Sequence, residues 1–174
     1  SMLEGAGVFF EHLCFDTSCV STLYEMLRET IVYNRPLAFD TRSVTTMGQM
    51  FWLAGAFDQP LAFDTSKVTD MFGMFFLATA FDQPLAFDTS SVTSMWGMFQ
   101  GASAFNQPLS WDVSSVIGTN GMLQMFDGTT ALSDCNKRVI EDSLSASTAW
   151  AAAGYDWSAL SCFTPANKAE LQAA

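Results

Sequence analysis

A 24-residue repeat is the feature that most constrains how this chain can fold. Residues 57–80 and 81–104 are identical at 18 of 24 positions, far more than chance supplies. A unit of this length cannot bury its apolar side alone, so neighbouring units must stack and share one core. The repeat is marked along the chain by a proline and a leucine, at Pro36-Leu37, Pro60-Leu61, Pro84-Leu85 and Pro108-Leu109.

The register of the repeat predicts five units between two atypical ends. A degenerate first unit begins near Phe9, and the fifth begins at Phe105. The fifth unit holds three extra residues between Val116 and Met122, which we expect to form an outward loop. The expected organisation is a cloning remnant and N-terminal lead at 1–8, five repeats at 9–131, a C-terminal cap at 132–163, and a linker or the start of a following module at 164–174.

Composition narrows the class of protein. With 174 residues, of which 49% are hydrophobic, the chain can bury a core as one domain. Its net charge of −11 leaves no basic surface to neutralise phosphates, so nucleic acid is not expected as a partner. No apolar run reaches the roughly 18 residues that a membrane span needs. We therefore expect a folded domain without a membrane span in this segment.

Each repeat changes character halfway along. In the third unit Leu61 and Phe63 alternate with Ala62, which predicts a short strand that begins at Pro60. The following apolar residues are spaced as on one face of a helix, which predicts a short helix after the turn at 64–66. The sequence thus predicts an α/β repeat in which each coil is a short strand plus a short helix. The residues on the expected helical face are Val68, Met71, Met74, Phe75 and Ala78.

The repeats resemble a known family. The segments FNQPLSWDVSSV at 105–116 and FDTSKVTDMFGMF at 63–75 are similar to the short repeats of bacterial surface proteins, including mycoplasma-type lipoproteins, which are grouped with BspA-like leucine-rich-repeat proteins. Phenylalanine at 39, 63 and 87, where tryptophan is usual, is more similar to the algal variants. The resemblance covers roughly residues 9–131. It implies a right-handed, leucine-rich-repeat-like solenoid, a secreted or cell-surface setting, and roles in adhesion or recognition, and it brings no catalytic residues.

The segment after the repeats predicts a helical C-terminal cap. The run DCNKRVIEDSL, residues 134–144, places Val139, Ile140 and Leu144 on one face of a helix. The aromatic residues that follow, Trp150, Tyr155 and Trp157, are suited to cover the open end of the last repeat.

Four cysteines bear on the compartment. Cys14 and Cys19 flank one tight turn and could form a disulfide, and Cys135 with Cys162 would close a loop of 28 residues around the cap. Such a bond would stabilise the fold by about 3–4 kcal/mol in the chain-entropy picture. The alternative is four free thiols in a cytosolic protein. Zinc is not expected, because there is no CxxC motif and His12, the only histidine, takes the position of the repeat proline.

Regular columns of polar residues have both a structural and a functional interpretation. An aspartate column could hold calcium, but an aspartate before Thr-Ser is typical of a turn in which the carboxylate accepts backbone N–H bonds. A glutamine column is expected to satisfy backbone groups in the same way. The columns are Asp16, Asp40, Asp64, Asp88 and Asp112, and Gln59, Gln83 and Gln107.

Threonine and methionine columns also repeat. Threonine ranks on a flat face could order water, which makes ice binding an alternative function, although hydroxyls beside a turn more often bond the backbone. The methionines, for example Met71 and Met74, are expected to pack the core with a phenylalanine column beside them. The threonines are Thr17, Thr41, Thr65 and Thr89, with Thr45, Thr69 and Thr93 nearby.

Positions that vary between repeats are where a binding surface is expected, because packing does not fix them. Four of them carry large aromatic residues, Trp52, Phe72, Phe76 and Trp96, which we expect either to form a partly exposed patch for a protein or sugar, or to stack as a rail between repeats.

The functional expectation is a non-catalytic extracellular or cell-surface module for protein or glycan interaction. An enzyme is not expected, because catalysis needs unlike groups that converge, whereas the carboxylates here are spread in identical columns. No cofactor or metal is expected. The alternatives are ice binding through the threonine columns and a purely structural spacer.

Overall fold

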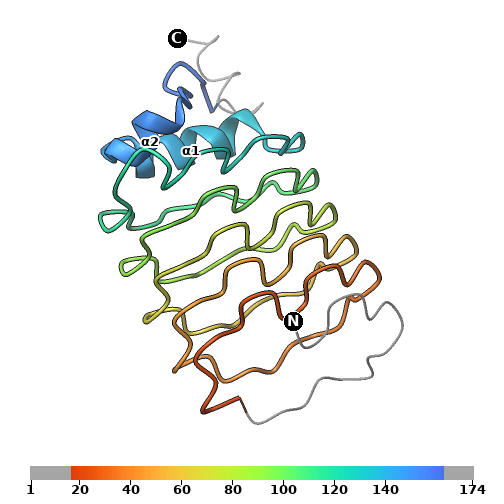
Figure 1. Ribbon diagram of the computed structural model, residues 1–174. Coiled ribbons are helices and arrows are strands. Elements are labelled where there is room, and N and C mark those ends of the chain that lie inside the picture. Colours follow the sequence, from red (N-terminus) through yellow and green to blue (C-terminus); the bar gives the residue numbers. More distant parts are fainter. Residues whose placement is uncertain (1–16, 163–174) are drawn as a thin grey trace.

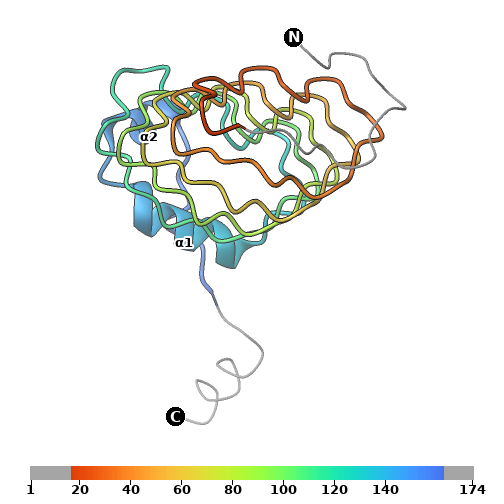
Figure 2. The ribbon, with the colours of Figure 1, turned by 90° about the horizontal axis from the view of Figure 1, so that it is seen from below.

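The fold is a stack of 24-residue turns of chain, closed at one end by two helices. The computed structural model describes residues 17–162, and Figure 1 shows the successive repeats lying one on top of another. Seen from below in Figure 2, the repeats form nested flattened loops of similar outline, with the helices across the far end. The repeats therefore share one core that runs the length of the stack.

Secondary structure within the repeats differs from the prediction. In the described residues, the helices are α1, Asp134–Leu144, and α2, Thr148–Ala153, both after the repeats. Neighbouring repeats are joined by three isolated parallel bridges, Thr22 to Thr46, Thr46 to Asp70, and Asp70 to Ser94, and no extended strand or sheet forms in the described part. The prediction of a short strand plus a short helix in each coil is therefore wrong. The leucine-rich-repeat-like solenoid of α/β class is wrong with it.

Backbone hydrogen bonds explain why no helix forms in the second half of a repeat. The N–H groups of Met47 and Gln49 donate to the next repeat, to Asp70 O at 3.0 Å and Phe72 O at 2.7 Å. The N–H of Met50, the residue after Gln49, donates back to Met47 O at 3.2 Å, and Phe51 N again donates to the next repeat, to Met74 O at 2.9 Å. In an α-helix each N–H group donates to the carbonyl four residues earlier in the same helix. N–H groups that donate alternately to the next repeat and to the same repeat therefore exclude an α-helix here.

Left-handed residues interrupt the chain twice in each repeat. Gln49 has φ of 55° and Leu53 has φ of 57°, a region that a right-handed helix cannot contain. The chain instead advances as a series of tight turns. Corresponding positive φ angles occur at Glu25 and Glu29, Gly73 and Leu77, Gly97 and Gly101, and Gln124 and Gly128.

The proline segment is not a strand, although its burial follows the predicted alternation. Leu61 and Phe63 are buried and Ala62 is exposed. Pro60 has no N–H group, and residues 60–63 make no backbone–backbone hydrogen bond to other described residues. The predicted inward residues, Leu61 and Phe63, are thus correct, while the predicted strand is absent.

Methionine and phenylalanine form the core, as predicted. Phe75 stacks on Phe51 at 5.3 Å and on Phe99 at 5.5 Å between ring centroids, and Phe99 continues to Phe126 at 5.6 Å. Every residue of the expected helical face in the third repeat is fully buried, namely Val68, Met71, Met74, Phe75 and Ala78.

The aspartate column caps turns and does not form a metal site among the described residues. Asp64 Oδ1 accepts from Ser66 N at 3.1 Å and from Ser66 Oγ at 2.7 Å. Thr65 is buried, and its hydroxyl donates to the carbonyl of Asp88 in the next repeat at 2.9 Å. The predicted turn role of these aspartates is therefore confirmed at Asp40, Asp64, Asp88 and Asp112, whereas Asp16 lies outside the described residues.

The glutamine column links repeats, but mainly through a different partner from the predicted one. The amide of Gln83 donates to Asp58 Oδ1 at 2.8 Å, and the same oxygen accepts from Asp82 N at 3.0 Å. A side-chain oxygen of the preceding repeat is thus the partner of all three glutamines, and the predicted bond to a backbone group forms at Gln107, which also donates to Asp82 O at 3.1 Å. Asn106 takes the position of Asp58 and Asp82 in its repeat and accepts from Ser133 N at 2.9 Å, which joins the repeats to the start of α1.

We expect the acid titration of Asp40 to depend on Arg42. The hydrogen bond from the Arg42 side chain, with its backbone N–H, lowers the pKa of Asp40 from 3.8 to about 2. Because the pKa is lower in the folded protein, this contribution to stability is complete above pH 3.8 and is lost as pH falls towards 2.

The change Arg42→Ala should raise the pKa of Asp40 towards 3.8 in an NMR titration of the carboxyl group. Asp112 is the matched control, because backbone and side-chain hydrogen bonds from Ser114 lower its pKa. An Asp40 pKa that stays near 2 in the variant would contradict the assignment.

The C-terminal cap forms as a helix at the predicted residues. Helix α1 covers Asp134–Leu144, with Ile140 and Leu144 buried and Val139 exposed. Phe126 of the last repeat contacts the rings of Trp150 and Trp157, with centroids 6.1 and 5.6 Å away.

A disulfide joins the two ends of the cap, Cys135 and Cys162. Among the described residues Cys19 is an exposed free thiol, and its proposed partner Cys14 lies outside them. The proposed linker at 164–174 also lies outside the described residues.

Candidate functional site

Four aromatic side chains form a continuous half-buried surface on the second half of the repeats. We call Trp52, Phe72, Phe76 and Trp96 the aromatic ledge. Trp52 lies 3.8 Å from Phe76 with an interplanar angle of 9°, and Phe72 lies 5.1 Å from Trp96 with an angle of 14°. The structure therefore brings together all four residues that variation between repeats indicated. They stack between repeats and also remain partly exposed.

A missing side chain creates the space for the first ring of the ledge. A Cβ atom on Gly73 would lie 2.8 Å from Cζ3 of Trp52, so the indole occupies the room that a larger residue would need. Arg28 lies over the other side of this indole, with its guanidinium carbon 5.6 Å from the ring centroid. Trp52 is thus covered at the end of the ledge that faces the N-terminal repeat.

The inserted residues lie at the opposite end of the ledge. Met95 N donates to Gly121 O at 2.8 Å and Gly97 N to Leu123 O at 2.9 Å, which places Gly121 one repeat after Ser94. The three extra residues are therefore 118–120. They are exposed, which confirms the predicted outward loop.

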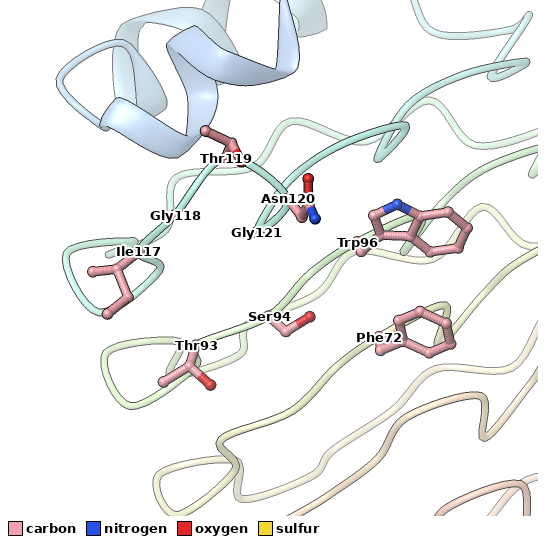
Figure 3. Close-up of a pocket in the computed structure, with 9 residues that line it drawn as sticks. All are labelled: Phe72, Thr93, Ser94, Trp96, Ile117, Gly118, Thr119, Asn120 and Gly121. Atoms are coloured by element: carbon pink, nitrogen blue, oxygen red, sulfur yellow. The ribbon is translucent and has the colours of Figure 1, made fainter.

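A cleft of about 590 Å³ lies between this loop and the ledge. Figure 3 shows Trp96 and Phe72 on one side, and Asn120 on the inserted loop on the other. A Cβ atom on Gly121 would come within 2.5 Å of Val116 Cγ1, so the local packing leaves no room for a side chain at this position. The lining residues are Phe72, Thr93, Ser94, Trp96, Ile117, Gly118, Thr119, Asn120 and Gly121.

Polar side chains in the cleft have unused hydrogen-bonding capacity. The hydroxyls of Ser94 and Thr119 and the amide of Asn120 make no hydrogen bond to other described residues. In an earlier repeat the same column is internally bonded, because Thr46 Oγ1 donates to Asp70 Oδ2 at 3.3 Å. This column consists of Thr46, Asp70 and Ser94, and its next member is Gly121, which has no side chain to bond the Ser94 hydroxyl. The cleft therefore presents free donors and acceptors beside an aromatic ring.

Sequence reasoning finds the aromatic half of this cleft and misses the polar half. The insertion is visible in the sequence, but its residues Thr119 and Asn120 are not among the predicted binding residues. The signal that could have found them is the coincidence of the insertion with the end of the aromatic columns, one repeat after Trp96. A break in a uniform stack exposes groups that the next repeat would otherwise cover.

Two further findings concern the described residues as a whole. Over residues 17–162, no three histidine, cysteine or acidic side chains come together in a way that could hold a metal ion. No helix within that range is both long and apolar enough to cross a membrane.

Comparison with known proteins identifies the family. No curated protein and no solved structure matches the chain. A family model described as "Mycoplasma protein of unknown function, DUF285" matches residues 1–84 and again residues 61–153, which together cover most of the chain. The chain therefore belongs to the DUF285 family of mycoplasma-type repeat proteins.

Proposed function

We propose that this protein is a non-catalytic recognition module that acts outside the cell or at the cell surface and binds a protein or glycan through the aromatic ledge. The observation that carries the proposal is the ledge itself: four large aromatic side chains, at positions that vary between repeats, lie together and half-exposed on one side of the stack. Aromatic residues are enriched at the energetic centres of interfaces.

The disulfide supports an extracellular setting. Disulfides such as Cys135–Cys162 persist in oxidising compartments and are rare in the cytosol. The similarity to BspA-like surface proteins and to algal variants, which goes beyond the family match, points the same way. The disulfide and this similarity both bear on the compartment, whereas the aromatic ledge bears on the binding partner.

The state of the aspartates supports a non-catalytic role. Hydrogen bonds from the Ser66 side chain and backbone lower the pKa of Asp64, and those from Ser90 lower the pKa of Asp88. A general acid or base works best with a pKa near the working pH, and these carboxylates are shifted away from it. They are suited to hold turns.

Ice binding and a spacer role are the alternative functions. The first threonine column is buried, as at Thr65, and therefore offers no surface to water. The second column is exposed, but the hydroxyls of Thr69 and Thr93 donate to the backbone of the preceding repeat, at 3.2 and 2.9 Å. Recognition by the ledge is favoured because its rings have exposed surface.

We expect the changes Trp52→Ala and Trp96→Ala together to weaken binding of a ligand found by screening glycans and extracellular proteins. Loss of interface aromatic residues costs about 2 kcal/mol or more, so the dissociation constant should rise about thirtyfold. Val139→Ala is the control, because Val139 is an exposed apolar residue on α1, away from the ledge. Binding unchanged by the double variant, with an unchanged circular dichroism spectrum, would exclude the ledge.

A further inference from the structure

We propose that the cleft beside the inserted loop binds a neutral sugar ring. The indole of Trp96 forms the apolar side of the site. The side chains of Ser94, Thr119 and Asn120 form hydrogen bonds with the sugar hydroxyls. This inference rests on the proposed recognition function and names the chemical class of the ligand and the end of the ledge that holds it.

Trp96 is the ring of the ledge best placed to contact a ligand. It stacks on Phe72 towards the preceding repeat, and among the described residues it has no aromatic neighbour towards the next one. The corresponding residue of the next repeat is Leu123, and the inserted loop lies beside it. Trp52, by contrast, has Phe76 against it and the Arg28 guanidinium nearby. The indole of Trp96 therefore borders the cleft, as Figure 3 shows.

The polar groups around Trp96 match a ring of hydroxyls. Ser94 and Thr119 each carry a hydroxyl that both donates and accepts, and the Asn120 amide does the same through two atoms. None of these three side chains makes a hydrogen bond to another described residue. Sugar hydroxyls are also both donors and acceptors, so each can pair with any of these groups. A buried aromatic side chain of a protein partner would leave most of them unpaired.

The lining of the cleft selects an uncharged ligand. None of its 9 residues carries an ionisable side chain. The net charge of −11 repels anions in general, and the cleft offers no arginine or lysine to offset that repulsion. It also offers no carboxylate to pair with a cation. Sialylated or uronate-containing glycans are therefore excluded as ligands by this proposal.

The cleft is large enough to hold a sugar ring and is open to solvent. Its volume of about 590 Å³ lies within the range of small-ligand sites, which is about 300–1,000 Å³. The loop residues Ile117, Thr119 and Asn120 are exposed, so the cleft opens to solvent and a chain can continue out of it. The C–H face of a sugar carries partial positive charge and suits the negative face of the Trp96 indole.

The test is calorimetric titration of the protein with cellotetraose, maltotetraose, mannotriose and tri-N-acetylchitotriose, with sialyllactose and a heparin tetrasaccharide as charged comparisons. We expect at least one neutral oligosaccharide to bind and the charged ones to fail. The change Trp96→Ala should weaken binding about tenfold or more. Thr119→Val and Asn120→Ala, both in the exposed loop, should each weaken it about threefold to tenfold.

The change Val139→Ala is the control, because Val139 is an exposed apolar residue on α1 and does not line the cleft. It should leave sugar binding within about twofold, a difference of less than 0.5 kcal/mol that is typical of surface changes away from a site. Binding of charged glycans alone, or neutral binding that Thr119→Val and Asn120→Ala do not change, would overturn the inference.

Two outcomes separate the sugar site from the recognition function. If no sugar binds but an extracellular protein binds and is lost in the Trp52→Ala and Trp96→Ala double variant, the sugar site is wrong and the recognition module stands. If neither class of ligand binds, both proposals are wrong.

Discussion

Replacing Phe75 by alanine is expected to lower the free energy of unfolding by about 3–5 kcal/mol. Phe75 is fully buried, and its ring lies between Phe51 and Phe99 of the two neighbouring repeats, at 5.3 and 5.5 Å. It also stacks on Phe81 at 4.1 Å. The change removes a ring from the middle of a continuous column, so it leaves a cavity that the neighbouring repeats cannot fill without moving.

Urea unfolding, followed by circular dichroism and by tryptophan fluorescence, measures this loss. The matched control is Phe72→Ala in the same repeat, because Phe72 is half-buried on the aromatic ledge and its loss should cost about 1 kcal/mol. Equal losses for the two variants would contradict the assignment of Phe75 to the core and Phe72 to the surface.

That contrast between Phe75 and Phe72 is the part of the fold that the sequence predicts well. Core positions follow from the repeat because residues that must touch the next unit stay apolar, as Met71, Met74 and Phe75 do. The helix at 134–144 was also predictable, since it has a serine N-cap at Ser133 and an apolar face of ordinary helical period.

Secondary structure within the repeat was not predictable from the same pattern. Met71, Met74, Phe75 and Ala78 have helical spacing, but a run of tight turns puts the same residues on one side. Periodicity reports which side chains are buried and not where each N–H group donates. The left-handed Leu77, with φ of 54°, shows the difficulty, because leucine gives no signal for that backbone region.

The candidate site was predictable only in part, for a related reason. The ledge follows from variable aromatic positions in known register, whereas the cleft depends on how an insertion without a repeat partner folds. Gly121 takes the position that follows Ser94 in the next repeat, and it offers no side chain that could bond the Ser94 hydroxyl. The register of the repeat alone does not reveal that the Ser94 hydroxyl lacks a side-chain partner.

Breaking the Cys135–Cys162 disulfide is expected to lower the free energy of unfolding by about 3–4 kcal/mol, because the bond closes a long loop in the unfolded chain. Cys135→Ser and treatment of the unchanged protein with dithiothreitol should have the same effect in urea unfolding. Dithiothreitol should add nothing to the variant. Cys19→Ser is the control, since Cys19 is an exposed free thiol and its loss should change little.

The same change tests whether the cap supports the cleft. The loop closed by the disulfide contains α2, whose Ala149 Cβ lies 3.5 Å from the position a Cβ on Gly121 would take. Trp150, next in the chain, packs on Phe126 of the last repeat. Loosening the cap should therefore let the inserted loop move and weaken ligand binding under conditions where the repeats remain folded. Full binding by folded Cys135→Ser protein would show that the loop holds its shape without the cap.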